Sequence, residues 1–287
     1  MPDVDVLFWW APWAPLAMHR GFTHGLVGGV LIMPPVLAGL LWLLDRWQCR
    51  QTTPAAPALP MRFGWLLALS FLGALTHPLL DLQNVYAVQL LSPLSEHWFH
   101  TDGLFIVSPW LLAFLGLGLW RSRRTKSARP ALLALAATFG FILLNIGISR
   151  LADEALRTSP PYPLADRVFA APAPMKFWQR DVIWRERGMI GRANYDPLSG
   201  LHRISAVQAP YPDHMNEPVV QRAAKATARV RDFLAWAQMP FAQVRAETGC
   251  RATVVFHDAR FADPAVNVGF SETATVPLSS AECRTSP

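Results

Sequence analysis

The chain has 287 residues, of which 52% are hydrophobic and only 16% are charged. A typical soluble domain has about 25% charged residues, so this composition excludes a disordered protein and argues against an ordinary soluble enzyme. The charges are unevenly distributed, since residues 1–149 hold 9 of the 26 Lys and Arg and 6 of the 20 Asp and Glu. The N-terminal half is therefore the apolar half of the chain.

The net charge is +6, and some of the basic residues are clustered. Five of them lie in one short stretch, namely Arg121, Arg123, Arg124, Lys126 and Arg129. A basic cluster directly after an apolar segment is typical of a membrane-topology signal rather than of a nucleic-acid surface. We expect no nucleic-acid partner.

Four apolar segments are long enough to be membrane-spanning helices, which need about 20 residues to cross a hydrocarbon core of about 30 Å. They are residues 24–44, 63–80, 104–120 and 131–149. Pro34 and Pro35 lie in the middle of the first segment and predict a kink there. The alternative is that these segments are buried helices of a soluble protein.

The distribution of Lys and Arg between the loops predicts the orientation, because positive loops are retained in the cytoplasm. Arg46, Arg50 and Arg62 follow the first segment, and the basic cluster follows the third. The loop between the second and third segments has no Lys or Arg, and after Asp81 at the end of the second segment its only charged residues are Glu96 and Asp102. We therefore expect that loop, the N-terminus and everything after residue 149 to lie on the outer side.

The pattern changes after residue 149, where a proline-rich stretch predicts a linker over residues 150–175. Short alternating runs separated by turn residues then predict strands, and one longer run predicts a helix. The expected strands are residues 177–186, 189–195, 201–207, 241–247, 251–257 and 268–275, and the expected helix is residues 218–238. The predicted fold is a mainly α-helical membrane protein with about four transmembrane helices over residues 1–149, followed by a small α+β domain over residues 176–287.

Five residues of the C-terminal region carry further expectations. Cys250 and Cys283 could pair if that region lies in an oxidising compartment. His202, His214 and His257 are expected to be ordinary surface residues of the small domain.

A set of ionisable residues in the membrane half, outside the cytoplasmic loops, falls on one side of the predicted topology. Such residues are costly near hydrocarbon and are functional candidates by default. They are Asp3, Asp5, His19, Arg20, His24, His77, Asp81, Glu96, His97, His100 and Asp102. The first segment begins on the outer side, the second ends there and the third begins there, so all of them fall on one membrane face.

Within this set, His77 and Asp81 are four residues apart, which places both side chains on one helical face at a distance suited to chelating a metal ion. His19 and His24 converge only if Gly21 allows a turn and the helix begins near Thr23. Mixed His and Asp ligands suit zinc, manganese or iron, and a metal ion lowers the pKa of bound water to give a nucleophile. Arg20 could bind an anionic group.

Each of these residues also has an ordinary structural interpretation. A single His near the end of a membrane helix is more often an interfacial side chain than a ligand, and His97 and His100 fit solvated loop positions. The chain has no HExxH, GxSxG, P-loop or GxGxxG motif, which argues against a zincin protease, a serine hydrolase or a nucleotide-binding enzyme. Apart from Asn145 the spans are nearly free of polar residues, which argues against a transporter.

Four stretches together resemble a known family. They are PDVDVL (2–7), HRGFTH (19–24), HPLLDLQN (77–84) and LLSPLSEHWFHTDGLFIVSPW (90–110). Their order and spacing are similar to those of bacterial inner-membrane proteins described as membrane-bound metal-dependent hydrolases, some of them as controlled by the SOS repressor. The resemblance implies a metal site involving Asp3, Asp5, His19, His24, His77, Asp81 and Asp102, with Arg20 and Asn84 nearby. We assign Arg20 and Asp102 to catalysis. The residues assigned to metal binding are Asp3, Asp5, His19, His24, His77 and Asp81.

Two features depart from the family pattern. Family members commonly carry a further helix with a Thr-His motif ahead of the PDxD segment, whereas this chain begins in that segment. The family often has Asp in its FIxDPW stretch, where this chain has Ser108. The second departure removes one candidate ligand or supporting partner.

The resulting hypothesis is an inner-membrane, metal-dependent hydrolase that cleaves an ester or phosphoester of a lipid or envelope molecule. The expected cofactor is a divalent metal ion, zinc or manganese, and the expected partners are membrane lipids and an anionic or phosphoester substrate. The alternative is a non-catalytic membrane protein whose metal site is structural or serves transport. The oligomeric state is left open.

Overall fold

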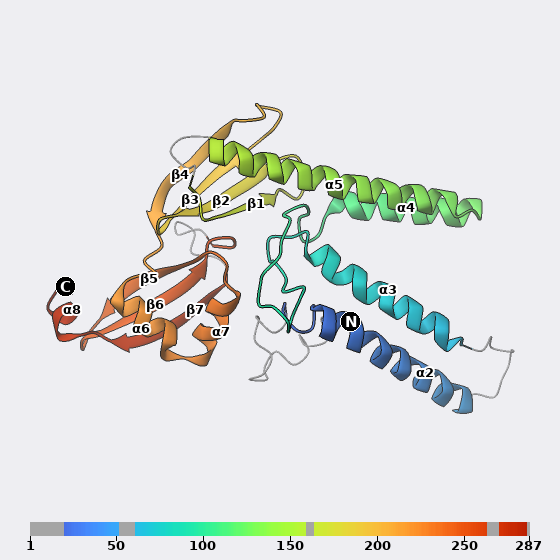
Figure 1. Ribbon diagram of the computed structural model, residues 1–287, viewed down its shortest axis with the longest axis horizontal. Coiled ribbons are helices and arrows are strands. Elements are labelled where there is room, and N and C mark those ends of the chain that lie inside the picture. The colour runs from blue at the N-terminus through green and yellow to red at the C-terminus, as the bar shows by residue number, and fades with distance from the viewer. Residues whose placement is uncertain (1–19, 52–60, 159–163, 263–269, 286–287) are drawn as a thin grey trace. The chain divides into compact units, whose positions relative to one another are not determined.

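The computed structural model describes residues 20–51, 61–158, 164–262 and 270–285 (Figure 1). Internal contacts divide the chain into two units. The first comprises residues 1–82 and 86–100, and the second comprises residues 83–85 and 101–287. This division places the third and fourth apolar segments with the C-terminal strands, which differs from the boundary expected from composition.

The first unit is built on a helical pair. A π-helix, η2 (Leu26–Ile32), leads directly into α2 (Met33–Gln51), and α3 (Phe63–Asp81) follows. The backbone N–H of Met33 donates to the carbonyl of Gly28, five residues earlier, and the next two residues are Pro34 and Pro35. Because proline has no N–H to donate, the prolines mark a change of helix type, at the position where the sequence predicts a kink.

Three helices in the described part of the chain are long and apolar enough to cross a membrane. They cover Leu26–Arg50, Phe63–Asp81 and Arg129–Thr158. Large apolar side chains along them face outward, such as Trp65 at 66% exposure and Leu133 at 71%. In a soluble protein such large apolar side chains would be packed in the core. Their exposure here fits helices surrounded by lipid.

In the second unit, α4 (Pro109–Thr125) and α5 (Arg129–Thr158) form a helical hairpin. The rings of Phe114 and Phe141 meet at 5.5 Å between centroids. Helix α4 has 17 residues and is not among the three helices above, so the fourth span stays a prediction. It starts five residues later than expected, because Ser108 caps it and Pro109 occupies its first turn.

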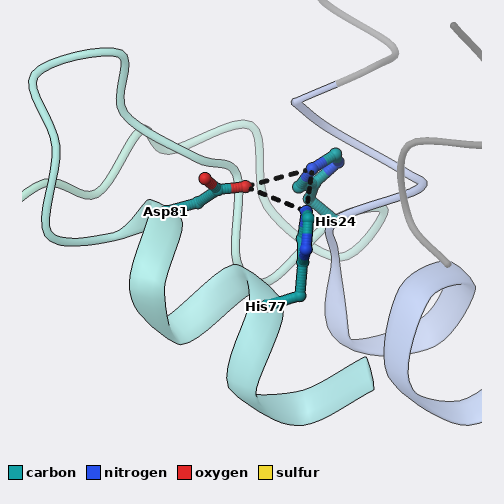
Figure 2. Close-up of side chains that lie close together, drawn as sticks. All are labelled: His24, His77 and Asp81. Atoms are coloured by element: carbon teal, nitrogen blue, oxygen red, sulfur yellow. Dashed lines mark hydrogen bonds and ion pairs between the residues drawn. The ribbon is translucent and has the colours of Figure 1, made fainter. Parts of the chain in front are cut away.

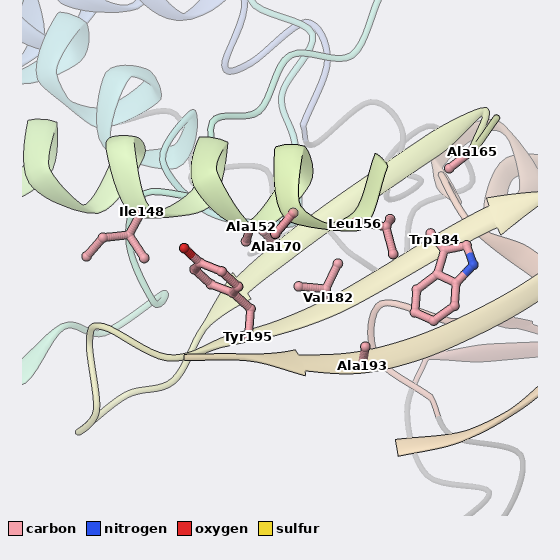
Figure 3. Packing of buried hydrophobic residues seen from close by; sticks show 10 residues of the cluster. Ile148, Ala152, Leu156, Ala165, Ala170, Val182, Trp184, Ala193 and Tyr195 are labelled. Atoms are coloured by element: carbon pink, nitrogen blue, oxygen red, sulfur yellow. The ribbon is translucent and has the colours of Figure 1, made fainter. Parts of the chain in front are cut away.

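Helix α5 extends well beyond the expected apolar segment and covers a sheet. The sheet is an antiparallel meander of β1 (Arg167–Pro172), β2 (Arg180–Glu186), β3 (Met189–Tyr195) and β4 (Ile204–Pro212). Ile148, Ala152 and Leu156 of α5 pack on Val182 and Tyr195 in a buried core (Figure 3). The expected linker over 150–175 is thus corrected, since its first nine residues continue the helix and Arg167–Pro172 form a strand.

A second, three-stranded sheet follows the short helices α6 (Pro218–Ala226) and α7 (Ala228–Trp236). Its strands are β5 (Pro240–Glu247), β6 (Arg251–Asp258) and β7 (Ser271–Pro277), and α8 (Ser280–Thr285) ends the described chain. The one helix expected over 218–238 is divided at Thr227, whose side chain caps α7. Cys250 and Cys283 form a disulfide with Cα atoms 5.2 Å apart, which confirms the expected pairing.

His257 corrects one expectation, because it is buried in β6 rather than exposed. Its ring stacks on Phe241 of β5 at 5.1 Å between centroids. Among the described residues, neither ring nitrogen has a hydrogen-bond partner. Burial therefore lowers the pKa of His257 below its ordinary value, because the charged form would lose its hydration.

Candidate metal centre

Three side chains of the first unit point toward one another at the end of α3 (Figure 2). The Nε2 atoms of His24 and His77 are 3.2 Å apart. The Asp81 Oδ2 atom is 3.1 Å from His24 Nε2 and 3.4 Å from His77 Nε2. Helix spacing predicted that His77 and Asp81 share a helical face, and the family resemblance implied His24 as a further site residue. The structure brings His24, 53 residues before His77, next to this pair.

The last turn of α3 presents two of the three residues. His77 and Asp81 lie one turn apart, and Pro78 is buried between them within the helix. The apolar run before them, with exposed leucines such as Leu69 and Leu72, forms the candidate span. The cluster is therefore carried at the end of a helix that is long enough to cross a bilayer.

His24 comes from a turn held by the loop that follows α3 in the first unit. The backbone N–H of Gln89 donates to Arg20 O, and the backbone N–H of Leu26 donates to Leu90 O, both at 2.9 Å. Between these two bonds, Gly25 lies so close to the loop that a Cβ atom there would be 2.6 Å from Ser92 O. Glycine is required at this close approach, and the result is a fully buried His24 ring.

The other nitrogen of the His24 ring is also occupied. Its Nδ1 atom is 3.2 Å from the hydroxyl of Thr23, which is itself buried. A partner at Nδ1 fixes the ring orientation and tautomer, as supporting groups do at metal-binding histidines. The first helix was expected to begin near Thr23, whereas the residue before η2 is Gly25 and the Thr23 side chain contacts the His24 ring.

Arg20 lies beside the carboxylate. Its Nη1 atom is 2.8 Å from Asp81 Oδ2, and its guanidinium lies 5.3 Å from the ring centre of Tyr86. Arg20 thus neutralises the carboxylate, and its guanidinium has further N–H donors next to the cluster.

The separations between the three donor atoms suit a small divalent ion. Ligand distances of about 2.0–2.2 Å place tetrahedral ligands about 3.3–3.6 Å apart and octahedral neighbours about 2.8–3.1 Å apart. The observed separations of 3.1–3.4 Å lie across these two ranges. Two imidazoles and one carboxylate are also the donor set that zinc and manganese accept. The residues therefore fit the expected ion.

The remaining predicted site residues are placed elsewhere or lie outside the described residues. Asp3, Asp5 and His19 belong to the latter group. Asp102 and Asn84 are buried in the second unit. The Asp102 carboxylate accepts a 2.8 Å hydrogen bond from the backbone N–H of Ala170 in β1. The described contacts of Asp102 connect it to the sheet, and its predicted catalytic role stays a prediction.

A buried polar network in the second unit was not predicted. Arg180 of β2 donates to the Ser149 hydroxyl at 2.8 Å and to both the carbonyl and the side-chain oxygen of Asn145. Ser149 in turn donates to Asp102 O at 2.6 Å. Burial lowers the pKa of Arg180 to about 10, partly offset by the negative charge of Asp102. The sequence contains one indication of this network, namely Asn145, a polar residue within an otherwise apolar segment.

Apolar, outward-facing helices, an attached α+β part and a His–His–Asp cluster define a membrane protein with a candidate metal centre. The family model described as YdjM inner membrane protein matches residues 1–150, and the chain belongs to that family. The match covers the stretches on which the resemblance rests, and it makes this an inner-membrane protein. No curated protein and no solved structure matches the chain.

Ser108 has a structural explanation within this family. Its hydroxyl accepts a hydrogen bond from the backbone N–H of Leu111 at 3.4 Å and so caps α4. Asp and Ser are both preferred at helix N-caps. An Asp at this position, as the family resemblance leads us to expect, could accept the same capping hydrogen bond as Ser108.

Proposed function

We propose that this protein is a metal-dependent hydrolase of the inner membrane, with its active site at the end of α3. The observation that carries the proposal is the convergence of His24, His77 and Asp81 donor atoms to within 4.8 Å of one another. These residues come from two separate segments, and the Gly25 contact and the loop hydrogen bonds hold them together. A cluster assembled in this way is more than the i, i+4 pair that any helix can present.

The residues would divide the work as follows. One divalent ion, zinc or manganese, would be held by His24, His77 and Asp81. The Thr23 hydroxyl would fix the orientation of the His24 ring. The ion would supply Lewis acidity and an activated water. Arg20 would bind a negatively charged oxygen of the substrate and stabilise the charge that develops during attack.

The substrate class follows from the location and charge of the site. The cluster lies at the end of a candidate span, where lipids and envelope precursors present their polar groups. Arg20 favours an anionic ester or phosphoester over a neutral one. The loop charges further support an outer, periplasmic location for the site and for the C-terminal region, with four spans in total.

The second candidate function is a non-catalytic membrane protein with a structural or transport-related metal site. One observation favours it, since the same three donors and Arg20 also form a closed set of ion pairs without any ligand. Such a set could stabilise the turn around His24 by itself. The two candidates differ in whether Arg20 contributes to turnover.

The deciding experiment measures hydrolysis by the full-length, zinc- or manganese-loaded protein in detergent on a panel of phosphoesters and lipid esters. We expect activity that is lost in His77→Ala and strongly reduced in Arg20→Gln, with metal content unchanged in Arg20→Gln. His202→Ala is the control, because His202 is exposed and lies in the second unit. Bound metal without hydrolysis of any substrate would favour the non-catalytic candidate.

A further inference from the structure

A group of exposed apolar side chains lies in the turns at one end of the first sheet. Met175 lies in the β1–β2 turn, and Leu198 and Leu201 lie in the β3–β4 turn. They are 63%, 78% and 55% exposed. In a meander these two turns lie at the same end of the sheet, and Gln179 of the first donates to the Asp196 carboxylate of the second at 2.8 Å. We call these three residues the turn rim.

Helix α5 shows which end of the sheet this is. Tyr195, the last residue of β3, lies near Ile148, whereas Trp184 lies near the Leu156 end of the helix (Figure 3). The rim therefore points toward the start of α5, along the segment that is apolar enough to cross a membrane. The β2–β3 turn, with Arg187, lies at the opposite end of the sheet.

The β1–β2 turn packs beside the uncharged segment of α5, which has no charged residue between Arg129 and Arg150. Phe141 lies within this segment, and its ring is 5.1 Å from that of Phe177 in the turn. The turn therefore lies at a level of α5 where the helix itself carries only uncharged residues.

A second contact ties the same turn to α4. The indole N–H of Trp110 donates to the carbonyl of Met175 at 3.1 Å, and the Trp110 ring is 5.8 Å from that of Phe177. The segment before α4 is also apolar and outward-facing, with Ile106 50% and Val107 60% exposed. Tryptophan at this level is typical of the membrane–water interface.

The backbone of the β3–β4 turn suits an apolar environment, where unpaired N–H groups are costly. The N–H of Leu198 donates to the Asp196 carboxylate at 2.9 Å. The N–H groups of Ser199, Gly200 and Arg203 donate to carbonyls within the turn. The turn therefore exposes its leucines while pairing these backbone donors internally.

We infer that the turn rim is a membrane-inserted surface: Met175, Leu198 and Leu201 occupy the headgroup–acyl boundary of the leaflet nearest Arg150. The exposed Lys176 and Arg203 beside them would contact lipid phosphates. The occupant is the lipid bilayer, and the sheet is held at the membrane by its turns as well as by α5. The inference is independent of the metal site and of which side of the membrane the sheet occupies.

The test is spin labelling of full-length protein in phosphatidylcholine–phosphatidylglycerol vesicles, in a Cys49→Ser background that leaves the disulfide intact. Leu198→Cys is compared with Met189→Cys, an exposed apolar residue at the opposite end of the same sheet. We expect the ratio of oxygen to water-soluble nickel accessibility to be severalfold higher at position 198.

Equal ratios at the two positions, with free access of nickel to both, would overturn the inference. Protection at position 198 that disappears when the protein is diluted with excess lipid would also overturn it, because a second copy of the chain would then be the occupant. Protection that persists on dilution supports insertion. The same labels in detergent, judged by mobility of the spectrum, verify that both variants are folded.

Discussion

The Nε2 atoms of His24 and His77 lie 3.2 Å apart, although 53 residues separate them in the chain. Asp81 Oδ2 completes the triangle at 3.1 Å and 3.4 Å. Without a ligand, each Nε2 atom carries at most one proton, so either one imidazole donates to the other or the rings donate to the Asp81 carboxylate. With a divalent ion bound, as we propose, the same three atoms would be its ligands. The predictions below distinguish a metal-binding cluster from a purely structural one.

Removing the Thr23 hydroxyl should weaken metal binding without unfolding the protein. In Thr23→Val the His24 ring loses its partner at Nδ1, and loss of such partners typically costs roughly 10- to 100-fold in metal affinity. Titration of the purified protein with zinc measures the change. Thr76→Val is the matched control, because the Thr76 hydroxyl donates to Gly73 O on the same helix as His77. Similar affinities in both variants would contradict the proposed role of Thr23.

Adding a methyl group at Gly25 should disturb the site more than the fold. In Gly25→Ala the new Cβ would meet Ser92 O at 2.6 Å, so the turn that carries His24 must shift. We expect lower zinc affinity while helix content measured by circular dichroism is preserved. Gly39→Ala adds the same methyl group to α2, where nothing lies within 4 Å, and should bind zinc normally. Unchanged zinc affinity in Gly25→Ala would contradict the claim that the close approach of Gly25 to Ser92 positions His24.

The capping role of Ser108 predicts an ordered response to substitution. Ser108→Ala should destabilise the start of α4 by about 1 kcal/mol, because an N-cap bond is lost. Ser108→Asp should preserve it, since the carboxylate can accept the same hydrogen bond. Hydrogen exchange of the first turn of α4 measures the difference. Faster exchange in Ser108→Asp than in Ser108→Ala would refute the capping role.

His257 predicts a loss of stability in mild acid. Burial lowers its pKa in the folded state, so the unfolded chain, with a pKa near the ordinary 6.5, takes up a proton first as the pH falls. The free energy of unfolding contributed by this residue is therefore retained above about pH 6.5 and decreases below it. His257→Phe should flatten this pH dependence in thermal unfolding between pH 8 and pH 5, whereas exposed His202→Gln should not. An unchanged slope in His257→Phe would contradict the assignment.

The fold was predictable where local signals were strong. Apolar runs gave α3 within one residue, and turn residues such as Arg187 and Gly188 placed β2 and β3. The helix break at Thr227 and the strand β1 were missed. Thr227 breaks the helix by capping α7 with its side chain. Strand β1 has a weak local pattern, and Ala170 within it is buried in the core that α5 forms with the sheet.

The candidate site was predictable in part for a similar reason. The i, i+4 spacing alone pairs His77 with Asp81, because helix geometry is local. The approach of His24 depends on Gly25 and on hydrogen bonds to the loop that contains Leu90, which no local pattern reveals. The Arg180 network was hidden because an arginine in a strand gives no sign that a helix more than 30 residues earlier will bury it. The family resemblance supplied what spacing could not.

The most direct test of the central claim is zinc binding by the full-length protein combined with X-ray absorption at the zinc edge. We expect one ion bound through two imidazoles and at least one carboxylate oxygen, at about 2.0–2.2 Å. His77→Ala should lose this ion while its helix content is unchanged, and His202→Ala should retain it. Zinc bound equally well by His77→Ala and the unmodified protein, or an absorption spectrum without imidazole ligands, would contradict the account.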